Sequence, residues 1–125
     1  MLAKIYRLKE KKDFRRVYQR GKSYAYPYFV LYSRGNNLAN YRVGFSVSKK
    51  VGKAVIRNKV KRRFRAAAKE NHQFFLPGKD YIFILRNPSV RASYNEICKQ
   101  MEKALGRLSS DIKDRSSKKG SGKNG

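Results

Sequence analysis

The residues whose types and spacing could do chemistry are cations concentrated in one short stretch, residues 57–65. Six of these nine residues are Lys or Arg and none is acidic. Arg57, Lys61 and Arg65 recur every four residues, so on an α-helix they lie along one face. A neighbouring face carries apolar residues that could pack on a core: Ile56, Val60, Phe64 and Ala67. Because solvated helix faces normally mix both signs of charge, we expect this helix to face a polyanion.

The rest of the chain offers little for catalysis. A metal-dependent nuclease needs clustered carboxylates, yet only eight acids are present. The close pairs among them are Glu10/Asp13, near the N-terminus, and Asp111/Asp114, near the C-terminus. Neither pair is expected to lie on a rigid part of the fold. The single histidine, His72, is expected at a surface or helix end, and the single cysteine, Cys98, in the core. We therefore predict no catalytic residue and no protein-bound cofactor or metal.

Length and charge narrow the class of protein. The chain has 125 residues, enough for one domain, and a formal net charge of +24. Such an excess is expected where a polyanion neutralises it, with nucleic acid the leading candidate and an anionic membrane surface the second. No apolar run approaches the roughly 18 residues of a spanning helix, and no apolar signal segment follows Met1. We expect a cytoplasmic nucleic-acid binder.

Three predicted helices and several strands would position these groups. The first helix spans about residues 12–20 with Asp13 as its N-cap, after an irregular lead-in. The basic helix spans about residues 54–71, and a last helix runs from the capping box Ser93/Glu96 to about Leu108. Tyr94 is placed on the apolar stripe of that last helix.

Three apolar stretches are typical of strands. Residues 28–32 and 41–47 alternate and are predicted to form a hairpin, whereas 81–85 is uniformly apolar and predicts a central strand. The order predicts an α+β fold, a two-layer α/β sandwich of a small mixed sheet with about three helices. One nucleic-acid-binding domain would cover residues 1–109, followed by a disordered basic tail at 110–125.

Aromatic residues could supply stacking surfaces beside the cations. In the first strand, alternation places Val30 and Tyr32 on one face and Phe29 on the other. Phe14, Tyr18 and Tyr32 beside the row of cations would make a groove for a single strand, because unpaired bases stack on aromatic rings. Gly44, in the middle of a strand, indicates a bulge or the close approach of another chain.

A longer motif surrounds the basic stretch. Residues 42–65 contain the pattern Arg-Asn-x-x-Lys-Arg-x-x-Arg at Arg57, Asn58, Lys61, Arg62 and Arg65. With the upstream segments Arg7-Leu8, Asp13-Phe14 and 29–32, this resembles the bacterial ribonuclease P protein subunit family, over about residues 7–108.

The resemblance implies a non-catalytic protein subunit of an endoribonuclease. Its partners would be a catalytic RNA and precursor tRNA, whose 5′ leader is removed by the RNA with RNA-bound magnesium. It also implies a ribosomal-protein-like fold with a left-handed βαβ crossover. By matching position, the leader cleft would comprise Phe14, Tyr18, Val30, Tyr32, Arg57, Lys61 and Arg65. The catalytic RNA would be bound by Lys49, Lys50, Lys53, Asn58 and Arg62.

Three other functions are compatible with a small, basic chain. A ribosomal-type or general structured-RNA-binding protein without a processing role would also be small and basic. A DNA-binding module using the basic helix is less favoured, since no dimerisation heptad accompanies it. A membrane-surface helix would need a larger apolar face than residues 54–71 provide. We therefore expect neither DNA nor membrane as a partner.

Overall fold

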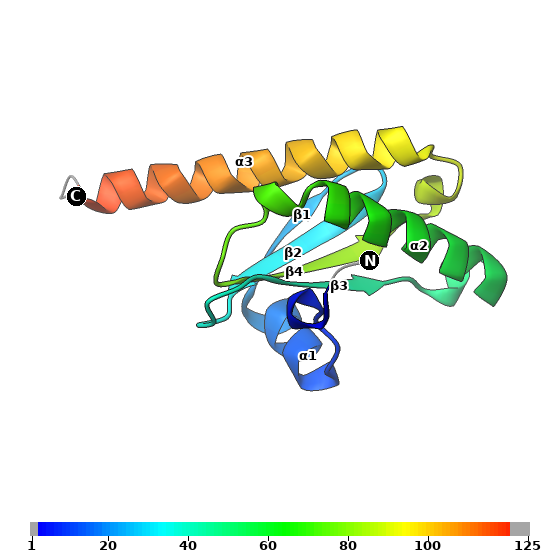
Figure 1. Cartoon of the computed structure of the whole chain (residues 1–125), viewed down its shortest axis with the longest axis horizontal. Coiled ribbons are helices and arrows are strands. Elements are labelled where there is room, and N and C mark those ends of the chain that lie inside the picture. The colour runs from blue at the N-terminus through cyan, green and yellow to red at the C-terminus, as the bar shows by residue number, and fades with distance from the viewer. Residues whose placement is uncertain (1–2, 121–125) are drawn as a thin grey trace.

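A four-stranded sheet with helices on both faces forms the body of the protein (Figure 1). The computed structural model describes residues 3–120, and side chains through residue 109. The strands are β1 (Lys22–Ala25), β2 (Phe29–Gly35), β3 (Arg42–Ser46) and β4 (Lys79–Leu85). The α-helices are α1 (Lys11–Arg20), α2 (Ala54–Glu70) and α3 (Tyr94–Gly120). Short 3₁₀ helices are η1 (Lys4–Tyr6), η2 (Lys49–Val51), η3 (His72–Phe74) and η4 (Asn87–Val90). The predicted α+β class with a small mixed sheet and three helices is confirmed.

The strand order is β1-β2-β4-β3, with β4 pairing antiparallel to β2 and parallel to β3. The predicted central position of β4 is confirmed, because a strand that is apolar on both faces is best buried between two neighbours. The predicted hairpin between β2 and β3 is wrong, since β4 occupies the place between them. The hairpin partner of β2 is instead β1, joined by a turn in which the Tyr26 amide donates to the Phe29 carbonyl at 2.8 Å.

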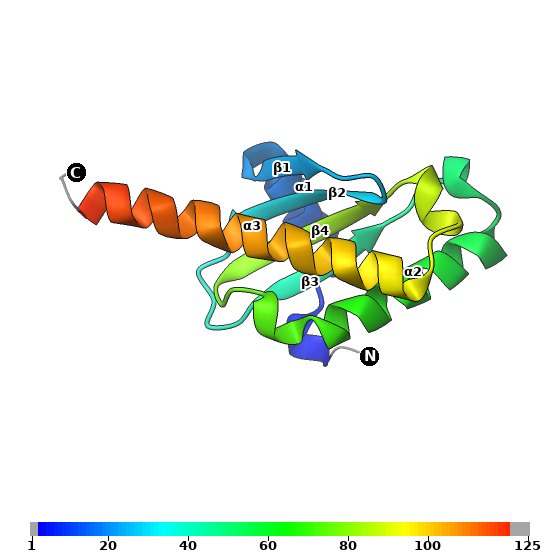
Figure 2. The ribbon, with the colours of Figure 1, turned by 90° about the horizontal axis from the view of Figure 1, so that it is seen from above.

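The segment β3–α2–β4 is a parallel crossover. In Figure 2, β3 and β4 both point to the right, α2 lies towards the viewer, and β4 lies above β3. With the view turned so that both strands point up, β4 is to the left of β3. The crossover is therefore left-handed, against the strong general preference for right-handed connections.

The main core lies between the sheet and the layer of α2 and α3, which run side by side over it (Figure 2). The predicted apolar stripe of α2 is confirmed, as Val60 and Phe64 are buried, and the Phe64 ring meets Phe29 edge-on at 6.0 Å. Asn71 ends α2 and ties it to α3, because its side-chain amide donates to the carbonyls of Ala67 at 3.0 Å and Cys98 at 3.2 Å.

Helix α3 begins at the predicted capping box. The Ser93 amide donates to Glu96 Oε1 at 2.9 Å, and the Glu96 amide donates to Ser93 Oγ at 3.1 Å. Tyr94 does not join the buried stripe as predicted, because its side chain lies over α2 and is 38% exposed.

The predicted end of α3 at Leu108 is wrong, since the helix continues to Gly120. Neither glycine nor proline stands between Gly106 and Gly120, so nothing in that stretch breaks the backbone ladder. Of the tail predicted at 110–125, residues 110–120 are thus helical, and residues 121–125 lie outside the described residues.

On the opposite sheet face, α1 and the lead-in pack around a smaller core of Leu8, Val17 and Ile82. The lead-in is more ordered than predicted, because Arg7 bridges Val43 in parallel and the Leu8 amide donates to the Val43 carbonyl at 2.9 Å. This single bridge extends the sheet beyond β3. One bridged residue is too short to give a periodic pattern in the sequence, so the bridge could not be predicted.

Asp13 is not the N-cap of α1, a position that Glu10 occupies. Asp13 is instead buried within the first turn of the helix, where Arg42 Nη1 lies 3.3 Å from its Oδ2. Arg42 also pairs with both oxygens of Asp80, at 2.9 and 2.8 Å. This ion-pair network joins α1 to β3 and β4.

Candidate nucleic-acid interface

The α1 face of the sheet is only partly covered, and the uncovered part forms the floor of the candidate site. The register places Val30, Ile84 and Ser46 in one row across β2, β4 and β3, and all three are half-buried. The next row, which contains Tyr32 and Gly44, lies beneath α1. The predicted alternation of β2 is confirmed, because Phe29 and Leu31 are fully buried on the opposite face.

Aromatic rings form one wall of this site. The Tyr18 ring meets Tyr32 edge-on at 5.1 Å, and the Phe14 ring lies 6.3 Å from Tyr18. Tyr18 is 37% exposed and its hydroxyl hydrogen-bonds with the Ser46 side chain. Burial raises the pKa of Tyr18 above 10, against the opposing effect of the Ser46 bond. The phenol is therefore neutral at pH 7 and does not repel an anionic strand.

Gly44 allows the Phe14 ring to lie close to β3. A Cβ atom added at Gly44 would lie 2.5 Å from Phe14 Cζ and 3.2 Å from Leu8 Cβ. The predicted close approach at Gly44 is thus made by α1 of the same chain. Any larger residue would displace the ring from its place beside Tyr18.

Two hollows meet at the edge of β3 and together form what we call the groove. The first, of about 220 Å³, is lined by Arg7, Leu8, Lys9, Val43, Gly44, Phe45 and Arg65. The second, of about 500 Å³, is lined by Lys9, Lys11, Phe14, Arg15, Tyr18, Gln19 and Ser46. Lys9 lines both hollows, so the two hollows are adjacent and together extend from the aromatic wall to Arg65 of α2. None of the described residues in either lining is acidic.

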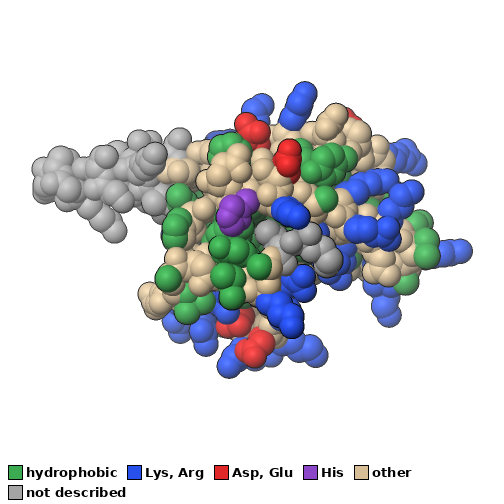
Figure 3. Space-filling model, in the orientation of Figure 1, with side chains coloured by type: hydrophobic (Ala, Val, Ile, Leu, Met, Phe, Trp, Pro, Cys, Tyr) green, Lys and Arg blue, Asp and Glu red, His purple; other side chains and the backbone are tan. Residues whose placement is uncertain are grey.

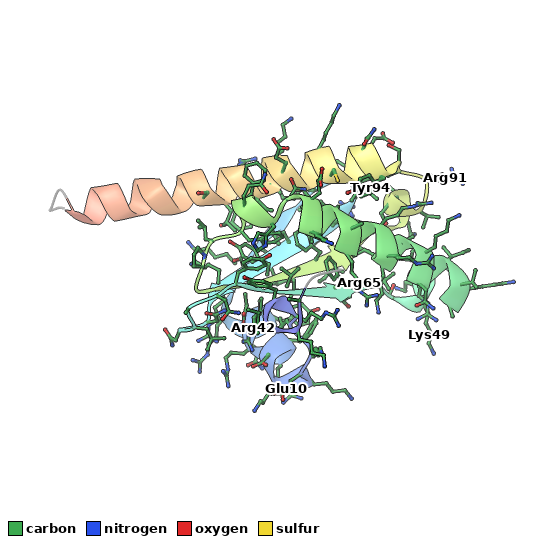
Figure 4. The ribbon with its side chains drawn as sticks, in the orientation of Figure 1. Glu10, Arg42, Lys49, Arg65, Arg91 and Tyr94 are labelled. Atoms are coloured by element: carbon green, nitrogen blue, oxygen red, sulfur yellow. The ribbon has the colours of Figure 1, made fainter. Side chains whose placement is uncertain are left out.

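The predicted cation row of α2 is only partly brought to this groove. Arg65 lines the first hollow and lies between α2 and the sheet (Figure 4). Arg57 lies two turns away, about 12 Å along the helix, and its Nε donates to the Gly52 carbonyl at 3.1 Å. Lys61, one turn from each, is half-buried. Of the seven residues predicted for the leader cleft, Phe14, Tyr18 and Arg65 line the groove. Val30 lies on the uncovered sheet face beside it, and Tyr32 lies beneath α1 against Tyr18.

The five residues predicted to bind a catalytic RNA form a separate basic surface on η2, the following loop and the first half of α2. All five are exposed: Lys49, Lys50, Lys53, Asn58 and Arg62. Lys and Arg side chains gather over this end of α2 (Figure 3). Lys49 projects from η2 at the end of the molecule away from the α3 C-terminus (Figure 4).

Several residues of the groove and of the sheet floor beside it were not predicted from the sequence. Arg7 and Lys9 were assigned to an irregular lead-in, and Ser46 and Ile84 were treated only as strand residues. Their positions depend on pairing between distant segments, which leaves no local signal. Only the upstream Arg7-Leu8 match to the motif indicated that the lead-in belongs to the site.

His72 lies outside the groove. It is exposed in η3, where its Nδ1 contacts the Tyr41 hydroxyl, and Tyr41 stacks on Tyr6 at 4.6 Å. Within the part of the chain that the structure describes, no three His, Cys, Asp or Glu side chains form a group that could hold a metal ion. Among those same residues, every helix is too short or too polar to cross a membrane.

Comparisons with known proteins point to one family. The family model for ribonuclease P matches residues 2–109 of this chain. The ribonuclease P protein component of Geobacillus sp. (strain WCH70) is 42% identical over 116 residues, which covers 90% of this chain and 100% of that protein. The ribonuclease P protein component of Alkaliphilus oremlandii is 46% identical over 93 residues, covering 74% of this chain and 82% of that protein.

Solved structures agree with the sequence relatives. A Staphylococcus aureus RNase P protein mutant, described as defective in mRNA degradation activity, superposes with a TM-score of 0.78 at 38% identity. That match covers 85% of this chain and 90% of the other. The RNase P protein from Thermotoga maritima gives a TM-score of 0.75 at 31% identity, covering 81% of this chain and 96% of the other.

Proposed function

The chain belongs to the ribonuclease P protein family, and we propose that it binds a catalytic RNA together with the 5′ leader of precursor tRNA. The predicted family and fold class are confirmed, and the chain is a protein component of ribonuclease P, an endoribonuclease of tRNA processing. The proposal adds the two RNA partners and assigns each of them a surface. A cytoplasmic location is part of the same proposal.

The observation that supports leader binding is the pair of adjacent hollows that form the groove beside β3. It combines the aromatic wall of Phe14 and Tyr18 with cations from the lead-in, α1 and α2. Aromatic faces stack unpaired bases at about 1–3 kcal/mol each, with little sequence preference. Lys and Arg beside them neutralise phosphates, which positions the strand without reading its sequence. A single-stranded leader matches both properties.

The basic surface on η2 and α2 would bind the catalytic RNA. Its exposed side chains could meet the closely spaced phosphates of a folded RNA, which a groove for one strand could not accommodate. In this proposal, the RNA supplies the active site and holds the magnesium, and the protein positions the substrate. The protein would thus contribute binding energy and orientation to the cleavage, and its own side chains would not touch the reacting phosphate.

The test is 5′ cleavage of a labelled precursor tRNA at low magnesium, comparing the protein alone, the catalytic RNA alone and the two mixed. We expect cleavage only in the mixture. Arg62→Glu should weaken assembly with the RNA, and Lys103→Glu, an exposed site on α3 with the same change of charge, is the matched control. No stimulation by the intact protein would refute the processing role and favour a general RNA-binding protein.

A second substrate separates the two surfaces. Tyr18→Ala removes one stacking ring, so we expect about tenfold weaker binding of a precursor with a leader. Binding of mature tRNA, which has no leader, should be unchanged. Equal losses for both would remove the groove from the proposal.

An unstructured mRNA fragment incubated with the protein alone would show whether this chain has the activity ascribed to the Staphylococcus aureus protein.

A further inference from the structure

A third hollow lies between η2 and η4, away from the groove. Its volume is about 580 Å³, within the usual range for small-ligand sites. The lining comprises Lys50, Val51, Asn87, Pro88, Val90 and Arg91. We call it the η2–η4 hollow. It joins two segments that are adjacent only in the fold, because η2 follows β3 and η4 follows β4.

Both walls of this hollow are held by arginines of α2. Arg57 Nε donates to the Gly52 carbonyl at 3.1 Å, which fixes the loop after η2. Arg63 Nη1 donates to the Val90 carbonyl at 3.2 Å and the Ala92 carbonyl at 3.4 Å, which fixes the end of η4. The guanidinium groups of Arg57 and Arg63 thus bind backbone carbonyls, although such groups could also bind RNA phosphates. The basic helix therefore builds the hollow as well as presenting charge.

The η4 wall has a further internal anchor. Ser89 is fully buried, and its Oγ donates to the Arg86 carbonyl at 2.6 Å. Pro88 restricts the backbone of the same turn. A hollow whose walls are already ordered loses little conformational entropy when a ligand enters, which favours binding.

The chemistry of the lining indicates its occupant. Val51, Pro88 and Val90 offer apolar surface to a flat ring, and the Asn87 amide offers a donor and an acceptor to its edge. Lys50 and Arg91 are exposed at the rim, and Arg91 projects from the turn before α3 (Figure 4). No described residue of the lining is acidic. The apolar walls would contact the face of a nucleobase and the amide would bind its edge. The two cations at the rim would bind the flanking phosphates.

We propose that the η2–η4 hollow binds one unpaired nucleotide of the catalytic RNA, an inference that rests on the function proposed above. Lys50 links the hollow to the basic surface, so an RNA on that surface could place a flipped-out base in it. The leader is a poorer candidate, because the hollow and the groove share no lining residue among those that the structure describes. An unpaired base at this position would fix the register of the RNA on a surface that otherwise binds phosphates alone.

The first test uses valine methyl NMR of the full chain, with a trinucleotide and its abasic analogue as probes. Val51 and Val90 report on the hollow, Val30 on the uncovered sheet face beside the groove, and buried Val60 on the fold. We expect the methyl resonances of Val51 and Val90 to shift with the trinucleotide and much less with the abasic analogue. Equal shifts with both probes would show phosphate binding only and overturn the proposal, as would shifts confined to Val30.

The second test measures binding of the catalytic RNA in the assembled complex. Val51→Glu places a carboxylate in the hollow and should weaken binding about tenfold. Val55→Glu, on the first turn of α2 and 78% exposed, makes the same change of charge outside the hollow and should have a smaller effect. Thermal unfolding confirms that both variants fold. Equal effects of the two variants would overturn the proposal that the hollow binds a nucleotide. Failure of the wild-type protein to bind the RNA would overturn the proposed function itself.

A third variant covers the case in which Val51→Glu does not fold. Arg91→Ala removes a rim cation that is exposed and makes no contribution to the core. We expect it to weaken binding of the catalytic RNA by a few-fold, with no change in the binding of precursor leader. Unchanged RNA binding would count against the proposal.

Discussion

Gly44→Ala tests whether the placement of α1 beside β3 builds the groove. The added Cβ would lie 2.5 Å from Phe14 Cζ and 3.1 Å from Phe14 Cε2, so the ring must move. The added Cβ would also lie 3.2 Å from Leu8 Cβ, which is a second tight contact. Overpacking of this kind costs about 1–3 kcal/mol, and replacing glycine within a strand recovers about 0.5–1 kcal/mol. We expect a net loss of about 1 kcal/mol in the free energy of unfolding, and of about 2.5 kcal/mol at most.

Urea denaturation measures this loss, and Gly106→Ala is the matched control. Gly106 lies on an exposed face of α3 with no atom within 4 Å of an added Cβ, so the same substitution there should stabilise by about 0.5–1 kcal/mol. The two glycine-to-alanine changes are therefore predicted to have opposite signs. Leader binding should also weaken in Gly44→Ala, because the displaced Phe14 ring no longer supports Tyr18.

A double-mutant cycle identifies the cause of the loss. In a Phe14→Ala background the clash is absent, so Gly44→Ala should cost much less than in the wild-type protein. Additive effects of the two substitutions would refute the reasoning. A Gly44→Ala variant as stable as the wild type, with unchanged leader binding, would refute it as well.

Three further predictions concern the fold. Asp80→Ala leaves Arg42 without its bidentate partner in a largely buried network, and should lower the free energy of unfolding by about 3 kcal/mol in urea denaturation. Ser93→Ala removes the N-cap bond of α3 and should cost about 1 kcal/mol, whereas a Thr replacement should be nearly neutral. Burial raises the pKa of Tyr81 and of Tyr41 to about 12, above the ordinary value of 10. The stability that these tyrosines contribute is therefore present below pH 10 and lost as the pH rises towards 12, and a pH-insensitive melting temperature in that window would contradict this.

The sequence predicted best what depends on neighbours along the chain. Helical spacing identified α2 and its buried Val60 and Phe64, and the Ser93/Glu96 pattern located the start of α3. Strand alternation separated Phe29 from Tyr32. Each of these rests on a local period or a short hydrogen-bonded motif, which a stretch of sequence carries by itself.

What it did not predict depends on partners that are distant in sequence. Asp13 looks like a helix cap, but its partner Arg42 lies on another element. The lead-in has no period, because one bridge between Arg7 and Val43 orders it. Arg57 shares a helix face with Arg65, yet it is used to hold the η2 loop. The predicted hairpin between β2 and β3 was wrong because β4 is inserted between them. The apolar sequence that makes β4 a central strand lies more than 30 residues after β3.

The central position of β4 has a consequence for synthesis of the protein. Translation proceeds from the N-terminus, so β1, β2 and β3 leave the ribosome well before Lys79–Leu85. Until then, β2 and β3 each lack the neighbour that they need, and their open edges could pair with other nascent chains. The dense positive charge from α1 through α2 keeps such chains apart by repulsion. The charge that suits this protein to bind RNA would thus also protect it from aggregation before its last strand is inserted.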